Sequence, residues 1–321
     1  MITRQVHLFR TGLATALLTA VSAASFSVFA TESATPTVHP FNLSPDQQRV
    51  HTPRNEAAIA QIPAGFKFAQ AGKFTVAVSG TASPPLALLA TDDKTTIGSE
   101  ADTAQLIADS LGLQLNVVQT SWEDWPLGVS SGKYDAVISN VTVTESRKKR
   151  FDFATYRQDV LGFYVKSTST ISSIKSADDI PGLRIIVGSG TNQEKVLLAW
   201  NASNEAAGRK PATLLYYDDN AAAQLAVKSG RVDAYFGPNS VSAYTAALSG
   251  GIKLVGIVNG GWPRRADIAV TTRKDNGLVT PIHTALEGAI AGGQYAAVLQ
   301  HWGLDVERID HSEINPPGLP D

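Results

Sequence analysis

Apolar positions in the first third of the chain recur with the period of a strand, then of a helix, then of a strand again. Residues 74–78 are mostly β-branched, aromatic or small, which predicts a strand. Ser99 can cap a helix over residues 99–111, and Gly112 can end it. Residues 113–117 then alternate between apolar and polar. Strand, helix and strand in this order predict a parallel sheet.

The same alternation of elements continues to about residue 236. It predicts strands at residues 134–139, 183–187, 214–217 and 232–236, and helices at residues 191–200 and 218–228. The periodic units fall into two groups, which are divided near residues 160–167 and again near residues 258–268. The pattern indicates an α/β fold in two parts, without a sequence repeat. It does not show whether the chain crosses twice between those parts.

The first thirty residues have the order of a secretory signal peptide. Arg4 and Arg10 flank a polar start, a short apolar run follows, and small residues end at Ala30. Because the run is short for a membrane span, we expect a cleaved signal peptide over residues 1–30 rather than an anchor. Residues 31–65 hold five prolines among polar residues and predict a flexible N-terminal extension.

Composition narrows the class of protein. With 43% hydrophobic and 17% charged residues, the 321-residue chain suits a soluble globular protein. Its formal net charge of -2 gives no electrostatic case for a nucleic acid or an anionic membrane as partner. The chain has no cysteine, which excludes disulfides, a thiolate nucleophile and a lipid-modified cysteine at the cleavage site. We therefore expect a soluble periplasmic protein.

Few motifs point to chemistry. Gly188 and Gly190 follow a predicted strand and open a helix, but Gln193 replaces the third glycine of a dinucleotide-binding turn. What remains is either a plain turn or a helix start that can hold an anion. The six histidines are scattered, without the spacing of metal ligands on a helix. We expect no metal, no cofactor and no catalytic residue.

Four basic residues, Arg147 to Arg150, form a run that is typical of a solvated surface. An arginine aimed inward could instead hold a carboxylate through two parallel hydrogen bonds. Since neighbouring residues point in different directions, one inward arginine with outward lysines fits this run. Trp122 and Trp125 are typical of core packing, or of an aromatic wall beside a ligand.

Residues 131–154 read Ser-Gly-Lys-Tyr-Asp-Ala-Val-Ile-Ser-Asn-Val-Thr-Val-Thr-Glu-Ser-Arg-Lys-Lys-Arg-Phe-Asp-Phe-Ala. This stretch strongly resembles the polar amino-acid family (family 3) of ABC-transporter solute-binding proteins. Shorter matches extend the resemblance over about residues 70–315, among them Pro84–Leu86, Gly98–Asp102, Val187–Thr191, Gly230–Ala234 and Trp302–Leu304. The resemblance implies a two-lobed periplasmic-binding-protein fold of type II. Each α/β lobe has a central sheet flanked by helices, and the ligand lies in the cleft.

The resemblance also implies where the lobes begin and end. Lobe 1 is expected over residues 66–160 and 263–321, and lobe 2 over residues 161–262. The two hinges are expected near residues 157–166 and 258–267. The family resemblance further implies a monomer.

In lobe 1, the resemblance assigns four ligand-binding positions. Arg147 matches the arginine that grips the α-carboxylate of the ligand. Asn140 and Thr142 match positions that bond the ligand through backbone and hydroxyl groups, and Trp122 matches an aromatic wall. In lobe 2, the helix start that completes the carboxylate site is matched by Gly190, Thr191 and Asn192.

The positions for the ligand ammonium depart from the family pattern. The aspartates that usually receive it are missing, and Gly80 and Pro238 stand in their places. We expect the neighbouring Thr81 and Asn239 to bind the ligand in their place, although Asn239 is at best a neutral substitute. A buried ammonium without a carboxylate partner is costly.

Two explanations for this departure remain open. Either Glu100, Asp102 or carbonyl oxygens take over as acceptors, or the ligand is not an ordinary α-amino acid.

Two function classes follow. The first is a binding protein that delivers an amino acid or related small carboxylate to the membrane permease of an ABC importer, closing its lobes on the ligand. The second is an exported dehydratase on the same fold, acting on a cyclic carboxylate, for which Glu100 and Glu123 are acid candidates by chain position only. The absence of an evident catalytic pair favours the binding protein.

Overall fold

The computed structural model describes residues 41–79, 82–217 and 219–320. The predicted signal peptide lies outside these residues. Their strands form two five-stranded sheets and one three-stranded sheet. No helix within the described ranges is both long enough and apolar enough to cross a membrane.

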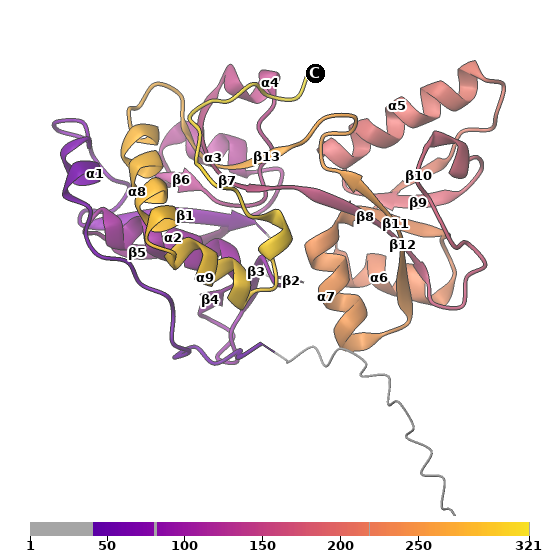
Figure 1. Cartoon of the computed structure of the whole chain (residues 1–321), viewed down its shortest axis with the longest axis horizontal. Coiled ribbons are helices and arrows are strands. Elements are labelled where there is room, and N and C mark those ends of the chain that lie inside the picture. The colour runs from indigo at the N-terminus through magenta and orange to yellow at the C-terminus, as the bar shows by residue number, and fades with distance from the viewer. Residues whose placement is uncertain (1–40, 80–81, 218, 321) are drawn as a thin grey trace, which may run out of the picture. The chain divides into compact units, whose positions relative to one another are not determined.

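The first five-stranded sheet has the order β5-β1-β6-β13-β7 (Figure 1). Its strands are β1 (Lys73–Ser79), β5 (Gln114–Thr120), β6 (Ala136–Val137), β7 (Phe151–Gln158) and β13 (Asp267–Arg273). Strand β1 runs parallel to both β5 and β6. Strand β13 runs antiparallel to both β6 and β7.

The second five-stranded sheet repeats this arrangement with the order β10-β9-β11-β8-β12. Its strands are β8 (Val160–Lys166), β9 (Arg184–Val187), β10 (Thr213–Tyr216), β11 (Ala234–Pro238) and β12 (Ile252–Asn259). Strand β9 runs parallel to β10 and β11, whereas β8 runs antiparallel to β11 and β12. Each sheet thus continues from three parallel strands into an antiparallel pair.

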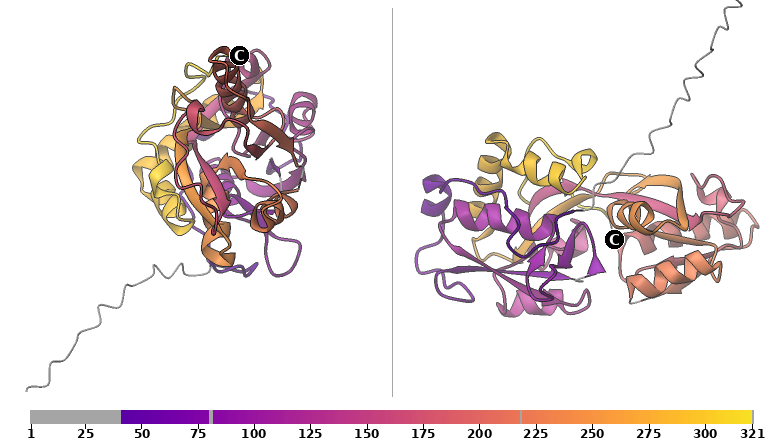
Figure 2. Two further views of the ribbon diagram at one scale, coloured as in Figure 1. Left: turned by 90° about the vertical axis from the view of Figure 1, so that its right-hand side faces the viewer. Right: turned by 90° about the horizontal axis from the view of Figure 1, so that it is seen from below.

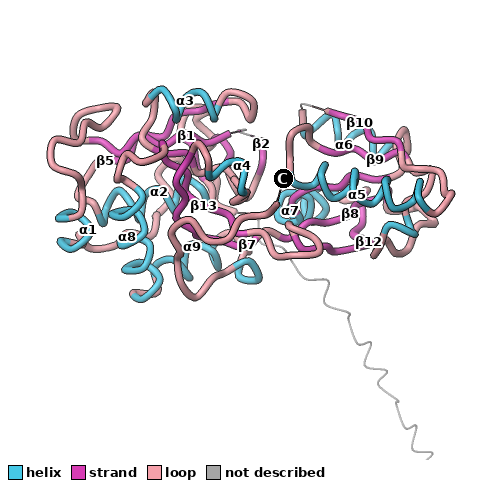
Figure 3. The backbone as a smooth tube through the Cα atoms, turned by 90° about the horizontal axis from the view of Figure 1, so that it is seen from above, coloured by secondary structure: helices cyan, strands magenta, loops and turns pink. Residues whose placement is uncertain are grey.

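The remaining elements surround the strands (Figure 3). The small sheet consists of β2 (Ala82–Ser83), β3 (Ala87–Leu89) and β4 (Thr96–Ile97). Helices outside the segment of the second sheet are α1 (Glu56–Ala60), α2 (Ser99–Ser110), α3 (Trp125–Ser131), α4 (Glu145–Lys148), α8 (Val279–Ala291), α9 (Gln294–His301) and η2 (Asp305–Glu307). Those within it are η1 (Ala177–Asp179), α5 (Asn192–Ala206), α6 (Asn220–Ser229) and α7 (Asn239–Ser249).

The chain passes twice between the two large sheets, a point that the sequence pattern left open. It leaves the first sheet between β7 and β8 and returns between β12 and β13 (Figure 1). The first residue of β8, Val160, pairs with the last residue of β12, Asn259. We call the first sheet with the elements packed on it lobe 1, and the second sheet with its helices lobe 2.

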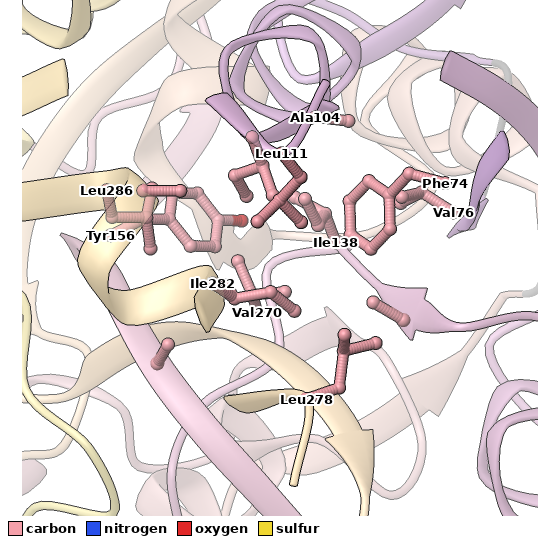
Figure 4. Close-up of a cluster of buried hydrophobic side chains, with 14 of the residues drawn as sticks. Phe74, Val76, Ala104, Leu111, Ile138, Tyr156, Val270, Leu278, Ile282 and Leu286 are labelled. Atoms are coloured by element: carbon pink, nitrogen blue, oxygen red, sulfur yellow. The ribbon is translucent and has the colours of Figure 1, made fainter. Parts of the chain in front are cut away.

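The core of lobe 1 lies on both faces of its sheet. Phe74 and Val76 of β1 pack with α2 and α8, for example with Ala104 and Ile282 (Figure 4). Ala77 of the same strand lies in a second cluster, with Trp125 of α3 and Phe151. Since side chains alternate along a strand, an almost wholly buried β1 requires cover on both faces.

Lobe 2 has the same layering, and Figure 2 shows its helices beside the strands from two further directions. Phe163 and Phe236 stack with ring centroids 4.0 Å apart, and Trp200 of α5 stacks on Phe163 at 5.7 Å. On the opposite face, Ile186 packs against Val227 of α6. Both lobes therefore have their own hydrophobic core.

Two predicted elements differ in length from those in the structure. The helix predicted at residues 191–200 continues to Ala206 as α5. The strand predicted at residues 134–139 shortens to β6, Ala136–Val137, because the chain then turns through Asn140, whose φ is +50°.

Residues 41–65, which we expected to belong to a flexible extension, instead pack on lobe 1. Asn55 caps helix α1, and Ala58 within that helix is buried in the core of lobe 1. His51 Nδ1 lies 2.7 Å from a carboxylate oxygen of Asp109. The polar composition therefore gave a wrong expectation for residues 41–65, because a helix cap and polar side-chain contacts hold them on lobe 1 as well as apolar contacts.

Candidate ligand-binding site

A cleft of about 370 Å³ is lined by residues from both lobes. Lobe 1 contributes the end of β1, the loop after β5 and the segment from Ser139 to Arg147. Lobe 2 contributes the turn before α5 and the end of β11. A ligand in the cleft could therefore contact both lobes at once.

Arg147 lies in the one-turn helix α4 and lines the cleft. Thr144 caps this helix, because its hydroxyl accepts a hydrogen bond from the Arg147 N–H at 3.1 Å. The Arg147 guanidinium donates to the Thr142 carbonyl at 2.8 Å and lies over the rings of Trp122 and Trp125, 5.4 and 5.9 Å from their centres. The sequence prediction of one inward arginine agrees with this geometry.

The charge of Arg147 has no anionic partner among the described residues, since none of their carboxylates forms an ion pair with it. Burial lowers the pKa of Arg147 to about 10, so the guanidinium stays charged at neutral pH. An unpaired, largely buried cation beside a cleft favours an anionic ligand.

The C-terminal segment holds α4 in place, and Figure 1 shows it running past this helix. The Gly318 N–H donates to the Glu145 carboxylate at 2.7 Å, and the Glu145 N–H donates to the Leu319 carbonyl at 2.9 Å. Lys148 reaches the Pro316 carbonyl at 3.0 Å, away from the cleft. A helix of one turn is marginal by itself, so these contacts position Arg147.

Helix α5 begins at the opposite wall of the cleft. Thr191 is its N-cap and accepts a hydrogen bond from the Glu194 N–H at 3.2 Å. Asn192 lines the cleft with only 7% of its surface exposed, and its side-chain amide nitrogen has no hydrogen-bond partner among the described residues. The first N–H groups of a helix also lack partners within the helix, which makes this end suited to an anion.

Gly190 is placed differently from the expectation. Its φ of +67° allows the turn into α5, but its N–H donates to the Glu194 carboxylate at 2.7 Å. It lines a hollow of about 490 Å³ next to the cleft. Its amide is therefore already occupied within the chain.

The other predicted residues divide into those in the cleft and those outside it. Trp122, Asn140 and Thr142 line the cleft. Asn239 does not, because its side-chain oxygen accepts a hydrogen bond from the Tyr164 hydroxyl at 2.9 Å, within lobe 2. Thr81 lies outside the described residues.

Of the two acids considered as replacement acceptors, only Glu100 borders the cleft. Its side chain is almost fully buried, and burial raises its pKa. Asp102, two residues later, accepts a hydrogen bond from the Trp302 indole at 2.7 Å and lies 3.7 Å from Arg49. Asp102 therefore belongs to the packing of α2 on α9.

Sequence reasoning missed several cleft residues and one buried arginine. The cleft residues are Leu86, Tyr217, Tyr235, Gly237 and Val241. The arginine is Arg157, fully buried under the cleft with Glu100 and Glu307. A single arginine within the otherwise buried strand β7 is the signal that could have identified it.

No group of three or more histidine and carboxylate side chains in the described ranges is arranged to hold a metal ion.

Comparison with known proteins gives consistent matches. Residues 74–305 match the family described as bacterial extracellular solute-binding proteins, family 3. The L-cystine-binding protein TcyJ of Escherichia coli (strain K12) is 29% identical over 75% of this chain and 87% of its own length.

Two solved structures show the fold. An ancestral arginine-binding protein bound to arginine is 30% identical over 72% of this chain and 98% of that chain, with a TM-score of 0.62. An ancestral amino acid-binding protein, named as a precursor of cyclohexadienyl dehydratase, is 25% identical over 72% of this chain and 95% of that chain, also with a TM-score of 0.62.

Proposed function

Because this chain belongs to the bacterial extracellular solute-binding proteins of family 3, we propose that it binds an amino acid or a related small carboxylate and delivers it to an ABC importer. Its relatives are named for binding cystine and arginine, and their fold is the same two-lobed fold. The ligand carboxylate binds between Arg147 and the start of α5.

The observation that carries this proposal is that two polar groups on opposite walls of the cleft lack a binding partner. Arg147 has a charge without an anionic partner among the described residues, and Asn192 has a buried amide nitrogen without an acceptor. A single carboxylate can accept hydrogen bonds from both walls, and the guanidinium fork suits its two oxygens. Such a ligand stabilises the state in which the two lobes approach each other.

The experiment is a ligand screen with the mature protein. Thermal unfolding is measured with each standard L-amino acid, with L-cystine and with small 2-hydroxy and dicarboxylic acids. A true ligand raises the melting temperature, and at equal concentration a tighter ligand raises it more. Isothermal titration calorimetry then gives the Kd. If no carboxylate in the screen binds, the proposal is wrong.

Lobe closure can be measured on the same samples. We propose that the chain bends near residues 157–166 and 258–267, and that it acts as a monomer. Small-angle scattering should then show a smaller radius of gyration with ligand, at an unchanged molecular mass. A ligand that binds without reducing the radius contradicts the closure mechanism.

A dehydratase remains the second candidate. It is supported by the ancestral precursor named above and by two carboxylates, Glu100 and Glu123, that border the cleft. Incubation with prephenate or arogenate and detection of the aromatic product decide between the two functions. Product formation that depends on Glu100 or Glu123 establishes the enzyme.

We also propose that the protein reaches the periplasm through a signal peptide cleaved after Ala30. Mass spectrometry of the protein from the periplasmic fraction should give a chain that begins at Thr31. A chain that retains its first thirty residues contradicts the cleavage.

A further inference from the structure

The charged residues that border the cleft are unevenly placed. Among the residues that the structure describes, they are Glu100, Glu123 and Arg147, all from lobe 1. The lobe 2 wall has Gly237 and Pro238, where a side chain could have carried a charge. A Cβ at Gly237 would overlap the hydroxyl of Tyr235, so this part of the wall is already filled. Among the described residues, a cationic group of the ligand therefore finds a carboxylate at the cleft only in lobe 1, at Glu100 or Glu123.

Glu100 belongs to a buried acid cluster, which we define as Glu100, Asp159 and Glu307 around Arg157. The Arg157 guanidinium forms a direct ion pair with Glu307 and lies 3.5 Å from Glu100. Asn140 joins the members. Its N–H donates to Glu100 at 3.3 Å, its side-chain oxygen accepts from Arg157, and its amide nitrogen lies 3.4 Å from Asp159.

The cluster holds more negative than positive charge. Three carboxylates share one guanidinium, and the remaining groups that face Glu100 are neutral: the Tyr156 hydroxyl from β7 and Asn140 from the loop after β6. Arg157 comes from β7 and Glu307 from η2. All three carboxylates are buried. Unbalanced buried charge is unfavourable, so the cluster either keeps protons or takes up another cation.

The pKa shifts of the three carboxylates agree with this excess of negative charge. Burial raises the pKa of Glu100 and of Asp159, against the opposing charge of Arg157. Burial also raises the pKa of Glu307 to about 7. Without a ligand, part of the cluster is therefore protonated near neutral pH.

Glu100 is the member that a ligand can reach, because it lines the cleft while Asp159 and Glu307 do not. A carboxylate offers about four acceptor sites. One oxygen of Glu100 accepts from the Asn140 N–H and from Arg157, and the other accepts from the Tyr156 hydroxyl. These contacts leave about one acceptor site on the second oxygen.

We propose that Glu100 receives a positively charged group of the ligand, so that the cleft selects zwitterionic amino acids over analogues that have the carboxylate but no cation. This rests on the proposed function, since the ligand carboxylate is held by Arg147. The cation adds the positive charge that the acid cluster lacks, and a proton leaves the cluster when it binds. Affinity for an amino acid therefore falls as the pH is lowered, because protons compete with the ligand cation.

The first experiment compares matched ligand pairs on two variants. The pairs are L-alanine with L-lactate and L-phenylalanine with L-3-phenyllactate, in which only the amino acid carries a cation. Glu100→Gln keeps the shape of the side chain and removes its charge, and we expect it to weaken binding of the amino acid at least about 10-fold. Binding of the hydroxy acid should change by less than about 3-fold. Glu56→Gln, at an exposed carboxylate of α1 that does not line the cleft, serves as the control and should change neither. Glu123→Gln tests the other carboxylate of the cleft, and selective loss of the amino acid in that variant instead of in Glu100→Gln would overturn the proposal.

The second experiment uses the wild-type protein, so that it tests the proposal even if the Glu100→Gln variant does not fold. Calorimetry in two buffers of different ionisation enthalpy should show proton release with the amino acid and none with the hydroxy acid. The Kd of the amino acid should rise several-fold from about pH 7.5 to about pH 5, while that of the hydroxy acid stays nearly constant.

The possible failures can be told apart. If Glu100→Gln weakens the affinity for the amino acid and for its hydroxy acid equally, Glu100 only supports the fold of the cleft, and the proposal is wrong. Equal affinity of wild-type protein for both members, without proton release, also overturns it. In either case binding of both acids through Arg147 would leave the proposed function standing, whereas no binding of either would remove both.

Discussion

Replacing Arg147 tests the site most directly. The guanidinium has one hydrogen bond within the chain, to the Thr142 carbonyl, and two contacts with tryptophan rings. None of these contacts neutralises its charge, so that charge is available to a ligand carboxylate. Removing one partner of a buried, hydrogen-bonded charge pair costs about 2–5 kcal/mol. Arg147→Ala should therefore raise the Kd by a factor of about 30 to a few thousand.

The same substitution should affect stability far less than affinity. It removes one hydrogen bond, about 1 kcal/mol, and two cation–π contacts, about 0.5–1 kcal/mol each, but it also relieves the burial of an unpaired charge. We expect the melting temperature of the ligand-free protein to change little. A large loss would mean that Arg147 is structural.

Binding is measured by calorimetry and by the fluorescence of Trp122 and Trp125, which flank the guanidinium. Arg150→Ala is the matched control, because Arg150 is an exposed arginine that borders the neighbouring hollow and not the cleft. A Kd for Arg147→Ala within about 2-fold of the wild-type value would refute the carboxylate assignment.

Three further predictions concern stability. Thr191→Ala removes the cap of α5 and should cost about 1 kcal/mol in urea unfolding, with Thr191→Ser as the control that keeps the cap; equal stability of both would contradict the capping role. Gly237→Ala should lower the melting temperature because its Cβ overlaps the Tyr235 hydroxyl, and the same substitution should cost less in a Tyr235→Ala background, where the overlapping ring is absent. Burial raises the pKa of Glu307 from 4.5 to about 7, so the folded state binds this proton more tightly than the unfolded state. The free energy of unfolding therefore falls as the pH rises from about 4.5 to about 7. Glu307→Gln should flatten that part of the pH profile of urea unfolding, and an unchanged profile would show that Glu307 does not titrate there.

Sequence reasoning was most successful where a local signal and a tertiary role coincide. The helix Asn192–Ala206 begins at the recognisable cap Thr191, and β1 and β9 are short apolar runs. The helix Ser99–Ser110 was also predicted, but its N-cap is Gly98, so the expected cap at Ser99 was wrong. Arg147 lines the cleft because a capped turn directs it there, and the family resemblance pointed to the same residue.

The sequence pattern was least informative where the structure depends on contacts between residues far apart in the chain. The antiparallel pair of β7 and β13 joins residues more than a hundred positions apart, and no local pattern encodes that partner. The acid cluster is similar, because Glu100, Arg157 and Glu307 come together only after the sheet and η2 have formed. Asn239 was misplaced for a local reason: as the first residue of α7 it bonds to Tyr164 instead of facing the cleft.

The double passage between the sheets has a consequence for how the molecule assembles. All strands of the second sheet lie between Val160 and Asn259, whose pairing brings the two ends of that segment side by side. The first sheet cannot be completed until β13, which lies between β6 and β7, has been synthesised. Residues 160–259 therefore have the architecture of an inserted module that can fold before its host. A short turn joining Gln158 to Asp267, which are themselves paired, could close the host without it.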